Sequence, residues 1–335
     1  MDLSQFIHKI PKTETHLHIE GALPWSFLEE LNPVKYSGVP YFRKADFRYK
    51  NFAQFESILI EHALEIFKTA EDYYRVASSI FKEAQSQNIR YMETSFHAGM
   101  IEFLKIPGTE ILDAIKSAVP SGLEVRVFLG MSRNAYSSYL GPIIEEAVNR
   151  WGDLSGIDLH GPEDLPVEDW TLPIWERASA KGLVLKAHAG EFGPASNIQH
   201  AISQLGAKRI QHGVAARESE MLLKQIVDEG ICLDMCPISN YKLQVVDSWQ
   251  DHPLQSFLNK GIQCTISTDD PFSFNNTLED EYHACVNKLG LSISDLVQIA
   301  KNGFIVSDLS NLEKERFIEE IDRTWDEFKG NDSSN

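Results

Sequence analysis

Near its start the chain reads Thr13-Glu14-Thr15-His16-Leu17-His18-Ile19-Glu20-Gly21. This segment is typical of a β-strand, in which every second side chain lies on the same face. His16 and His18 are therefore expected to share a face at the end of the strand. Two imidazoles placed in this way can bind one metal ion through their neutral nitrogens. Alone, a His-x-His pair is more often an ordinary surface pair, so the hypothesis depends on the rest of the chain.

Length and charge limit the classes of function. The 335 residues are 43% hydrophobic and 24% charged, which allows a sizeable core in one large α/β barrel or in two to three average domains. The formal net charge is −18, and no dense run of Lys and Arg occurs. Binding to nucleic-acid backbones or anionic membranes is therefore not expected, because both need clustered cations. A nucleoside or a free base is not excluded.

The first twelve residues are too short and too polar for a signal peptide, and no apolar run approaches the ~18 residues of a membrane span. We therefore expect a cytoplasmic protein whose four cysteines (Cys232, Cys236, Cys264 and Cys285) are free, buried thiols. The spacing of Cys232 and Cys236 suggests a metal site. Because Cys232 falls in an apolar, strand-like run, we expect both to be core residues.

Eight short apolar segments alternate with longer amphipathic segments. Strands are predicted over residues 13–19, 89–95, 125–129, 156–159, 183–187, 209–212, 231–235 and 263–267. Helical periodicity predicts helices over residues 70–87, 111–118, 142–151, 173–181, 196–205, 218–229 and 253–260. This alternation predicts an α/β fold, a (β/α)8 TIM-type barrel. An open doubly wound sheet is the alternative, but no Gly-x-Gly-x-x-Gly turn follows a predicted strand.

The segment between the first two predicted strands, residues 22–88, is long and carries a further helical pattern over 52–67. We expect extra helices inserted here, at the mouth of the barrel, where insertions commonly form lids. No Pro/Ser-rich linker divides the chain, so residues 1–330 are predicted to form a single domain, with residues 293–328 as outer helices. Residues 331–335 are predicted to be a disordered tail.

Chemically useful side chains recur at the ends of the predicted strands, where barrels of this kind place their functional residues. They are His16, His18, His188, Glu191, His212, Asp269 and Asp270. Three histidines and one aspartate can complete the protein ligands of a metal ion and leave a position open for water. Each residue alone has an ordinary structural explanation, such as a turn at Asp-Asp-Pro. Four coincidences at the same end of successive strands are hard to explain by packing.

The motifs resemble those of the adenosine/adenine deaminase family of the amidohydrolase superfamily. They are His16-Leu17-His18-Ile19-Glu20-Gly21-Ala22, His188-Ala189-Gly190-Glu191, Gln211-His212-Gly213 and Ser267-Thr268-Asp269-Asp270-Pro271. The resemblance extends to Tyr91-Met92-Glu93, Gly156-Ile157-Asp158-Leu159-His160-Gly161 and Cys236-Pro237-Ile238-Ser239-Asn240. It covers nearly the whole chain in the expected order.

The resemblance implies one Zn²⁺ per chain, bound by His16, His18, His188 and Asp269, the last also counted among the catalytic residues. Such an ion lowers the pKa of a bound water to about 7, and His212 is expected to orient that water and accept its proton. Glu191 is implied to be the proton shuttle, protonated and hydrogen-bonded to ring N1, which requires a raised pKa. Asp270 is expected at N7 of a purine, and the Gly161 backbone N–H at N3.

The fourth predicted strand ends without a lysine, so the carboxylated lysine of binuclear relatives is missing and a single metal ion is expected. His160 stands at this end, where the family commonly has a small residue. Its side chain either enters the pocket or lies outward on the rim.

The implied reaction is hydrolytic deamination of a 6-aminopurine base or nucleoside to the 6-oxo product and ammonia, with adenosine as the default substrate. Glu20 replaces the aspartate that contacts ribose in adenosine-type members, as in members that take adenine or modified purines. Phe55 is expected in the lid over the substrate, and its neighbour Glu56 is expected to be solvated. Adenine, N6-substituted adenines and larger adenine nucleosides such as aminodeoxyfutalosine therefore stay as alternatives.

Two other classes of function remain. One is an amidohydrolase that acts on another ring or amide with the same machinery. The other, more remote because every ligand and Glu191 are present, is a non-catalytic metal protein that binds purines. An oligomer is compatible with the sequence.

Overall fold

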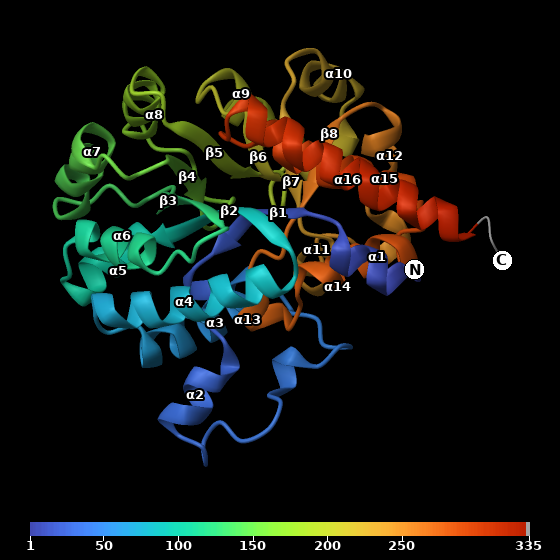
Figure 1. The fold of residues 1–335 in the computed structure, drawn as a ribbon. Helices are drawn as coiled ribbons and strands as arrows, with labels where there is room; N and C mark the ends of the chain where they lie inside the picture. The colour runs from blue at the N-terminus through green and yellow to red at the C-terminus, as the bar shows by residue number, and fades with distance from the viewer. Residues whose placement is uncertain (333–335) are drawn as a thin grey trace.

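The computed structural model describes residues 1–332 and shows eight parallel strands arranged in chain order around a barrel (Figure 1). The strands are β1 (Lys12–His18), β2 (Ile89–His97), β3 (Glu124–Ser132), β4 (Gly156–His160), β5 (Val184–Ala189), β6 (Arg209–His212), β7 (Cys232–Met235) and β8 (Gln263–Ile266). At the mouth, the His18 N–H donates to the Asp269 carbonyl at 3.2 Å, and the Asp269 N–H donates to the His16 carbonyl at 3.0 Å. These bonds join the first strand to the segment after the last strand. The predicted (β/α)8 fold is confirmed.

A ring of helices surrounds the strands (Figure 1). Those that match predicted segments are α3 (Phe52–Ile66), α4 (Ala70–Ser86), α6 (Gly108–Ser117), α7 (Leu140–Arg150), α8 (Thr171–Ala180), α9 (Ala195–Ser203), α10 (Glu220–Asp228), α12 (Leu254–Asn259), α15 (Ile293–Val306) and α16 (Asn311–Asp332). The sequence of α4 explains its formation: Thr69 and Asp72 form a reciprocal capping box at its start. Its apolar residues recur at helical spacing and are buried.

Further helices lie near the barrel mouth or at its outer side. They are α1 (Leu3–Lys9), α2 (Trp25–Leu31), α5 (Ala98–Leu104), α11 (Pro237–Lys242), α13 (Pro271–Phe274), α14 (Leu278–Asn287) and four 3₁₀ turns, η1 (Glu20–Ala22), η2 (Tyr41–Arg43), η3 (Val214–Glu218) and η4 (Trp249–Asp251). The insertion after β1 holds α2, α3 and α4, and α2 projects away from the barrel (Figure 1).

The prediction of a disordered tail fails at its first two positions, because residues 331 and 332 belong to α16, whose hydrogen-bonded backbone continues to that point. The other three, residues 333–335, lie outside the described residues. The four cysteines are buried and free, as expected. No helix among the described residues is long and apolar enough to cross a bilayer.

Charged side chains fill part of the interior of the barrel, below the mouth at which the strands end. The Lys186 Nζ lies 2.5 Å from Glu93 Oε2 and donates to the Thr15 carbonyl at 2.6 Å. Arg209 pairs with Asp234 at 2.8 Å and with Glu93 at 3.1 Å. All of these side chains are nearly inaccessible to solvent. We call the four charged residues, Lys186, Glu93, Arg209 and Asp234, the barrel-core network. Layers of branched apolar side chains are the more usual filling of such a barrel.

Candidate active site

Four candidate metal ligands meet at the mouth of the barrel: His16 and His18 on β1, His188 on β5 and Asp269 after β8. His188 Nε2 lies 3.0 Å from His16 Nε2 and 3.2 Å from His18 Nε2. Asp269 Oδ1 lies 3.3 Å from His16 Nε2 and 3.4 Å from His18 Nε2. The carboxyl ends of parallel strands bring these side chains together although up to 253 positions separate them in the chain.

The spacing of these four ligand atoms fits a metal ion. A tetrahedron with metal–nitrogen and metal–oxygen distances of ~2.0–2.1 Å has edges of about 3.3–3.4 Å. Three smaller groups of possible ligands lie nearby, and each shares at least one residue with the four-residue group. The group of His16, His18, His188 and Asp269 is therefore the best candidate for a metal site.

Neighbouring groups hold the other nitrogens of the candidate ligands. His188 Nδ1 lies 3.2 Å from Asp158 Oδ1, and His18 Nδ1 lies 2.9 Å from Ser95 Oγ. A carboxylate behind an imidazole orients the ring and makes it a better ligand. These contacts indicate a site that is organised for metal binding.

The backbone is strained at two residues of the site. His212 and Asp269 both have left-handed conformations, with φ of 62° and 64°. Non-glycine residues rarely adopt this region, and they do so most often at functional sites. Ser239 donates to Asp269 Oδ2 at 2.7 Å and holds the carboxylate in place.

Glu191 lies beside the candidate ligands, on the loop after β5. Its side chain is only 7% exposed, and its Oε1 has no hydrogen-bond partner among the described residues. Burial, with the nearby charge of Asp269, raises the pKa of Glu191 well above its usual range. A neutral carboxylic acid at this place can donate a hydrogen bond to a ring nitrogen. Nε2 of His212 is 3.6 Å from Glu191 Oε1.

A chain of hydrogen bonds determines the tautomer of His212. The Leu254 N–H donates to His252 Nδ1 at 3.3 Å, so the His252 proton is on Nε2, 3.2 Å from Asn240 Oδ1. The Asn240 amide then donates to His212 Nδ1 at 3.0 Å. A neutral His212 therefore carries its own proton on Nε2, facing Glu191. In this state its Nε2 can donate to a bound water, and proton acceptance at Nε2 would require the Asn240 amide to turn over.

Glu163 holds the loop that carries Glu191. Its carboxylate accepts from four successive backbone N–H groups, those of Gly190, Glu191, Phe192 and Gly193, at 2.7–2.9 Å. Asn197 donates to it at 3.1 Å, and Arg133 lies 3.7 Å away. Burial alone would raise the pKa of Glu163, but these hydrogen bonds outweigh it and lower the pKa, so the carboxylate is ionised.

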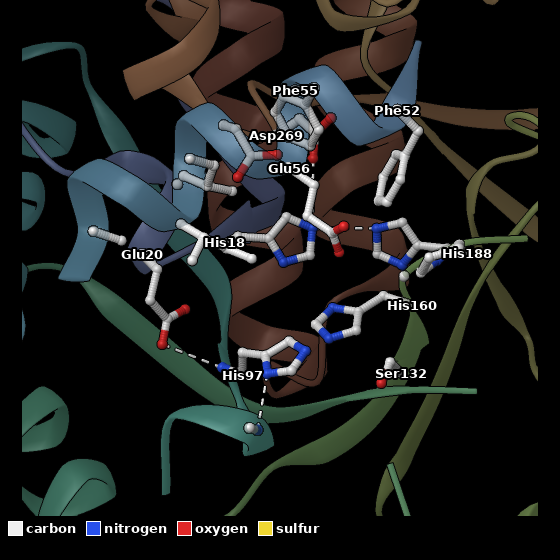
Figure 2. A pocket seen from close by; sticks show the side chains of 18 of the residues that line it. His18, Glu20, Phe52, Phe55, Glu56, His97, Ser132, His160, His188 and Asp269 are labelled. Carbon is white, nitrogen blue, oxygen red and sulfur yellow. Dashed lines mark hydrogen bonds and ion pairs between the residues drawn. The ribbon is translucent and has the colours of Figure 1, made fainter. Parts of the chain in front are cut away.

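A cavity of about 530 Å³ opens above the candidate ligands. Figure 2 shows Phe52 and Phe55 of α3 on one side of it, and His97, His160 and Ser132 on the other. Its apolar lining includes Phe52, Phe55, Leu59, Ile60, Ala63, Leu64, Met100, Phe103, Leu165 and Leu243. Its volume is within the ~300–1,000 Å³ that is typical of small-molecule sites.

The structure places the other sequence-predicted residues in this cavity. Gly161 and Asp270 line it, as does Phe55. Asp270 is buried, and its Oδ1 has no hydrogen-bond partner among the described residues. Glu56, which the sequence predicts to be solvated, is instead half-buried and lines the cavity, because α3 turns this part of its surface toward the mouth. His160 enters the cavity and does not lie on the rim.

The chain matches the family model described as adenosine deaminase over residues 11–324. An adenine deaminase of Zymomonas mobilis subsp. mobilis is 31% identical, over 98% of this chain and 99% of the relative. The chain belongs to the adenosine deaminase family. It is therefore a hydrolase that acts on carbon–nitrogen bonds of cyclic amidines.

Solved structures share the fold. The crystal structure of an adenine deaminase from Arthrobacter aurescens has a TM-score of 0.84 and 24% identity, over 94% of this chain and 98% of the other. An amidohydrolase from Burkholderia ambifaria, with bound Zn, has a TM-score of 0.84 and 22% identity, over 98% and 96% of the two chains.

Several residues of the site are missing from the sequence-based prediction. Tyr73 donates to Glu20 Oε1 at 2.8 Å, and the His97 N–H donates to the same oxygen at 3.2 Å. His97 is the last residue of β2, so the rule that strand ends carry function identifies it. Tyr73 and Glu163 lie in a helix and a long loop, and only the fold brings them to the site.

Proposed function

We propose that this chain is a metal-dependent adenine deaminase, which hydrolyses the 6-amino group of adenine to give hypoxanthine and ammonia. The observation that carries the proposal is a group of three histidines and Asp269 beside a buried, unpartnered Glu191 in a ligand-sized cavity. Relatives named adenine deaminase support adenine, the alternative in the sequence-based prediction, over adenosine, its default.

The proposed metal is one Zn²⁺, held by His16, His18, His188 and Asp269. Nitrogen and oxygen ligands of this kind suit Zn²⁺, and the Zn-bound Burkholderia structure supports the choice. When bound, Zn²⁺ activates water as a nucleophile near neutral pH.

The side chains of the protein position the ring and move the protons. Neutral Glu191 donates its proton to N1, which makes C6 electrophilic. His212 orients the attacking water toward C6. The water oxygen bonds to C6 and the bond between C6 and the amino nitrogen breaks. One water proton passes to the amine, which leaves as ammonia, and the other returns to Glu191 and restores its neutral form. Asp270 contacts N7, the Gly161 N–H contacts N3, and Phe55 packs beside the ring.

The charge of the cavity favours a neutral substrate. Five carboxyl-bearing residues line it: Glu20, Glu56, Glu191, Asp269 and Asp270. No Lys or Arg of the described chain is among the lining residues. A nucleotide phosphate would find no cation to bind, so a base or a nucleoside fits better.

An adenine nucleoside is the second candidate, because the cavity has room for more than one purine ring. The test is an ultraviolet absorbance assay of zinc-loaded protein with adenine, adenosine and N6-methyladenine, with ammonia measured in parallel. We expect adenine to be consumed with one equivalent of ammonia released. Zinc-loaded protein that leaves every 6-aminopurine unchanged would contradict the proposal.

A further inference from the structure

His160 lines the cavity and carries a buried hydrogen-bonding atom without a partner among the described residues. The side chain lies at the end of β4, directly before Gly161, and the residue is 7% exposed. Its Nε2 has no hydrogen-bond partner among the described residues. Figure 2 shows the ring between His97 and His188, on the side of the cavity opposite Phe52. A buried polar atom without a partner is costly unless a ligand completes it.

The position of the His160 ring is built into the fold. A Cβ atom at residue 130 would lie 2.5 Å from His160 Cε1, so Gly130 on β3 makes the room that the ring occupies. The ring of His97 stacks on it, with centroids 4.8 Å apart and planes inclined by 14°. His97 is itself fixed, because its Nδ1 accepts from the Gly99 N–H at 2.8 Å.

The place of His160 relative to the reacting atoms indicates what it binds. In the proposed reaction C6 faces the metal ligands, and Gly161 contacts N3, on the opposite side of the six-membered ring. N9 is attached to the same carbon as N3, so it lies on the same edge. Free adenine carries N–H at N9, whereas a nucleoside carries ribose there. A neutral imidazole has one acceptor nitrogen that can pair with such an N–H.

We propose that His160 selects the free base over the nucleoside: its Nε2 accepts a hydrogen bond from N9–H of adenine, and its ring occupies space that ribose needs. This inference rests on the proposed deaminase function. His97 is a positioning residue that holds the His160 ring. A substrate alkylated at N9 would bury the Nε2 atom without a partner, which is how a polar site rejects an analogue that lacks the matching group.

Binding calorimetry of the zinc-loaded protein tests the inference independently of turnover. The ligands are hypoxanthine and 9-methylhypoxanthine, which differ only at N9. We expect the wild-type protein to bind hypoxanthine about 10- to 100-fold more tightly, the range that corresponds to one unsatisfied buried group. In His160→Phe, which keeps the ring and loses the acceptor, the preference should fall to about threefold or less by the same reasoning. His200→Phe, an exposed change on α9, is the matched control and should keep it.

Turnover adds a second measurement. His160→Ala opens the space at N9, so the ratio of kcat/KM for adenine to that for adenosine should fall by about 10-fold or more. Equal affinities of the wild-type protein for the two hypoxanthines, or an unchanged preference in His160→Phe, would overturn the inference. Loss of bound zinc in His160→Ala would also overturn it, because His160 would then be a ligand. Failure of the proposed function is a different result: no turnover of any 6-aminopurine by the wild-type protein.

Discussion

Glu163 fixes the loop that carries Glu191 but is not itself among the residues that line the cavity. Its carboxylate accepts hydrogen bonds from four successive N–H groups of this loop. In Glu163→Gln the charge is lost and an NH2 group, which is a donor, replaces one of the oxygens that face the N–H groups. We expect kcat to fall about 10- to 100-fold with a smaller change in KM, because the loop no longer fixes Glu191.

The control for Glu163→Gln is Asp164→Asn, an identical change of charge at the next, exposed residue. It should leave kcat and KM near the wild-type values. Steady-state kinetics with adenine measures both variants, and zinc content shows whether the candidate ligand His188, on β5 just before this loop, is still in place to bind metal. A wild-type kcat in Glu163→Gln would show that the loop holds Glu191 without this carboxylate.

The proposed proton shuttle, Glu191, can be distinguished from the proposed metal ligands by substitution. Glu191→Gln should keep its zinc and lose turnover by a factor of roughly 10² or more, because the amide cannot deliver a proton to N1. His16→Ala should instead lose zinc. Metal analysis after gel filtration and the ultraviolet assay distinguish the two. Near-normal turnover in Glu191→Gln would show that another group protonates the ring.

At the residue scale the sequence predicts which candidate ligands come together, because His16, His18, His188 and Asp269 each lie near or just after the end of a recognisable strand. It does not predict the residues that organise them. Glu163 has no motif of its own, and its four partners become visible only when the loops after β4 and β5 are seen together. The cavity position of His160 likewise depends on the missing side chain at Gly130 of the neighbouring strand.

At the scale of the elements, α3 has two roles: it covers the cavity, and it packs on the barrel mouth. Phe55 is buried, and its ring stacks on Phe274 with centroids 5.6 Å apart and planes inclined by 10°. Phe55→Ala should lower the free energy of unfolding by about 3–5 kcal/mol and also raise the KM for adenine. Phe52→Ala, at a half-buried position of the same helix, should cost less stability. Urea unfolding with the same metal content gives both values, and equal costs would contradict the packing argument.

Most of the longer helices are predicted because they contain two or more turns of apolar periodicity, although the ten-residue α14 is missing from the prediction. The short helices α5, α11 and α13 are not predicted, since four to seven residues are too few for a clear period. They begin directly after β2, near the end of β7 and after β8, where the barrel mouth determines the course of the backbone. Tertiary packing, more than helical propensity, stabilises such elements.

For the whole molecule, metal binding and folding are expected to be coupled. The four candidate ligands come from β1, β5 and the segment after β8, so an ion would join distant parts of the barrel. Removal of metal by a chelator should lower Tm by several degrees, and added Zn²⁺ should restore it, because a ligand that binds only the folded state stabilises that state. Differential scanning calorimetry measures the shift. His16→Ala should show no recovery, and a Tm unaffected by chelation would argue against a tightly bound ion.

The barrel-core network has a consequence for assembly. Eight βα units of similar shape are nearly interchangeable, so an apolar interior would discriminate poorly between the correct neighbours and wrong ones. In the network, β2 and β7 contribute carboxylates, and β5 and β6 contribute cations, so each of these strands carries a charge that needs a particular neighbour. A strand inserted at the wrong place would leave a buried charge without its partner, at a cost of about 3–5 kcal/mol. The buried charges are therefore expected to favour the correct strand order over wrong ones in a pseudo-symmetric barrel.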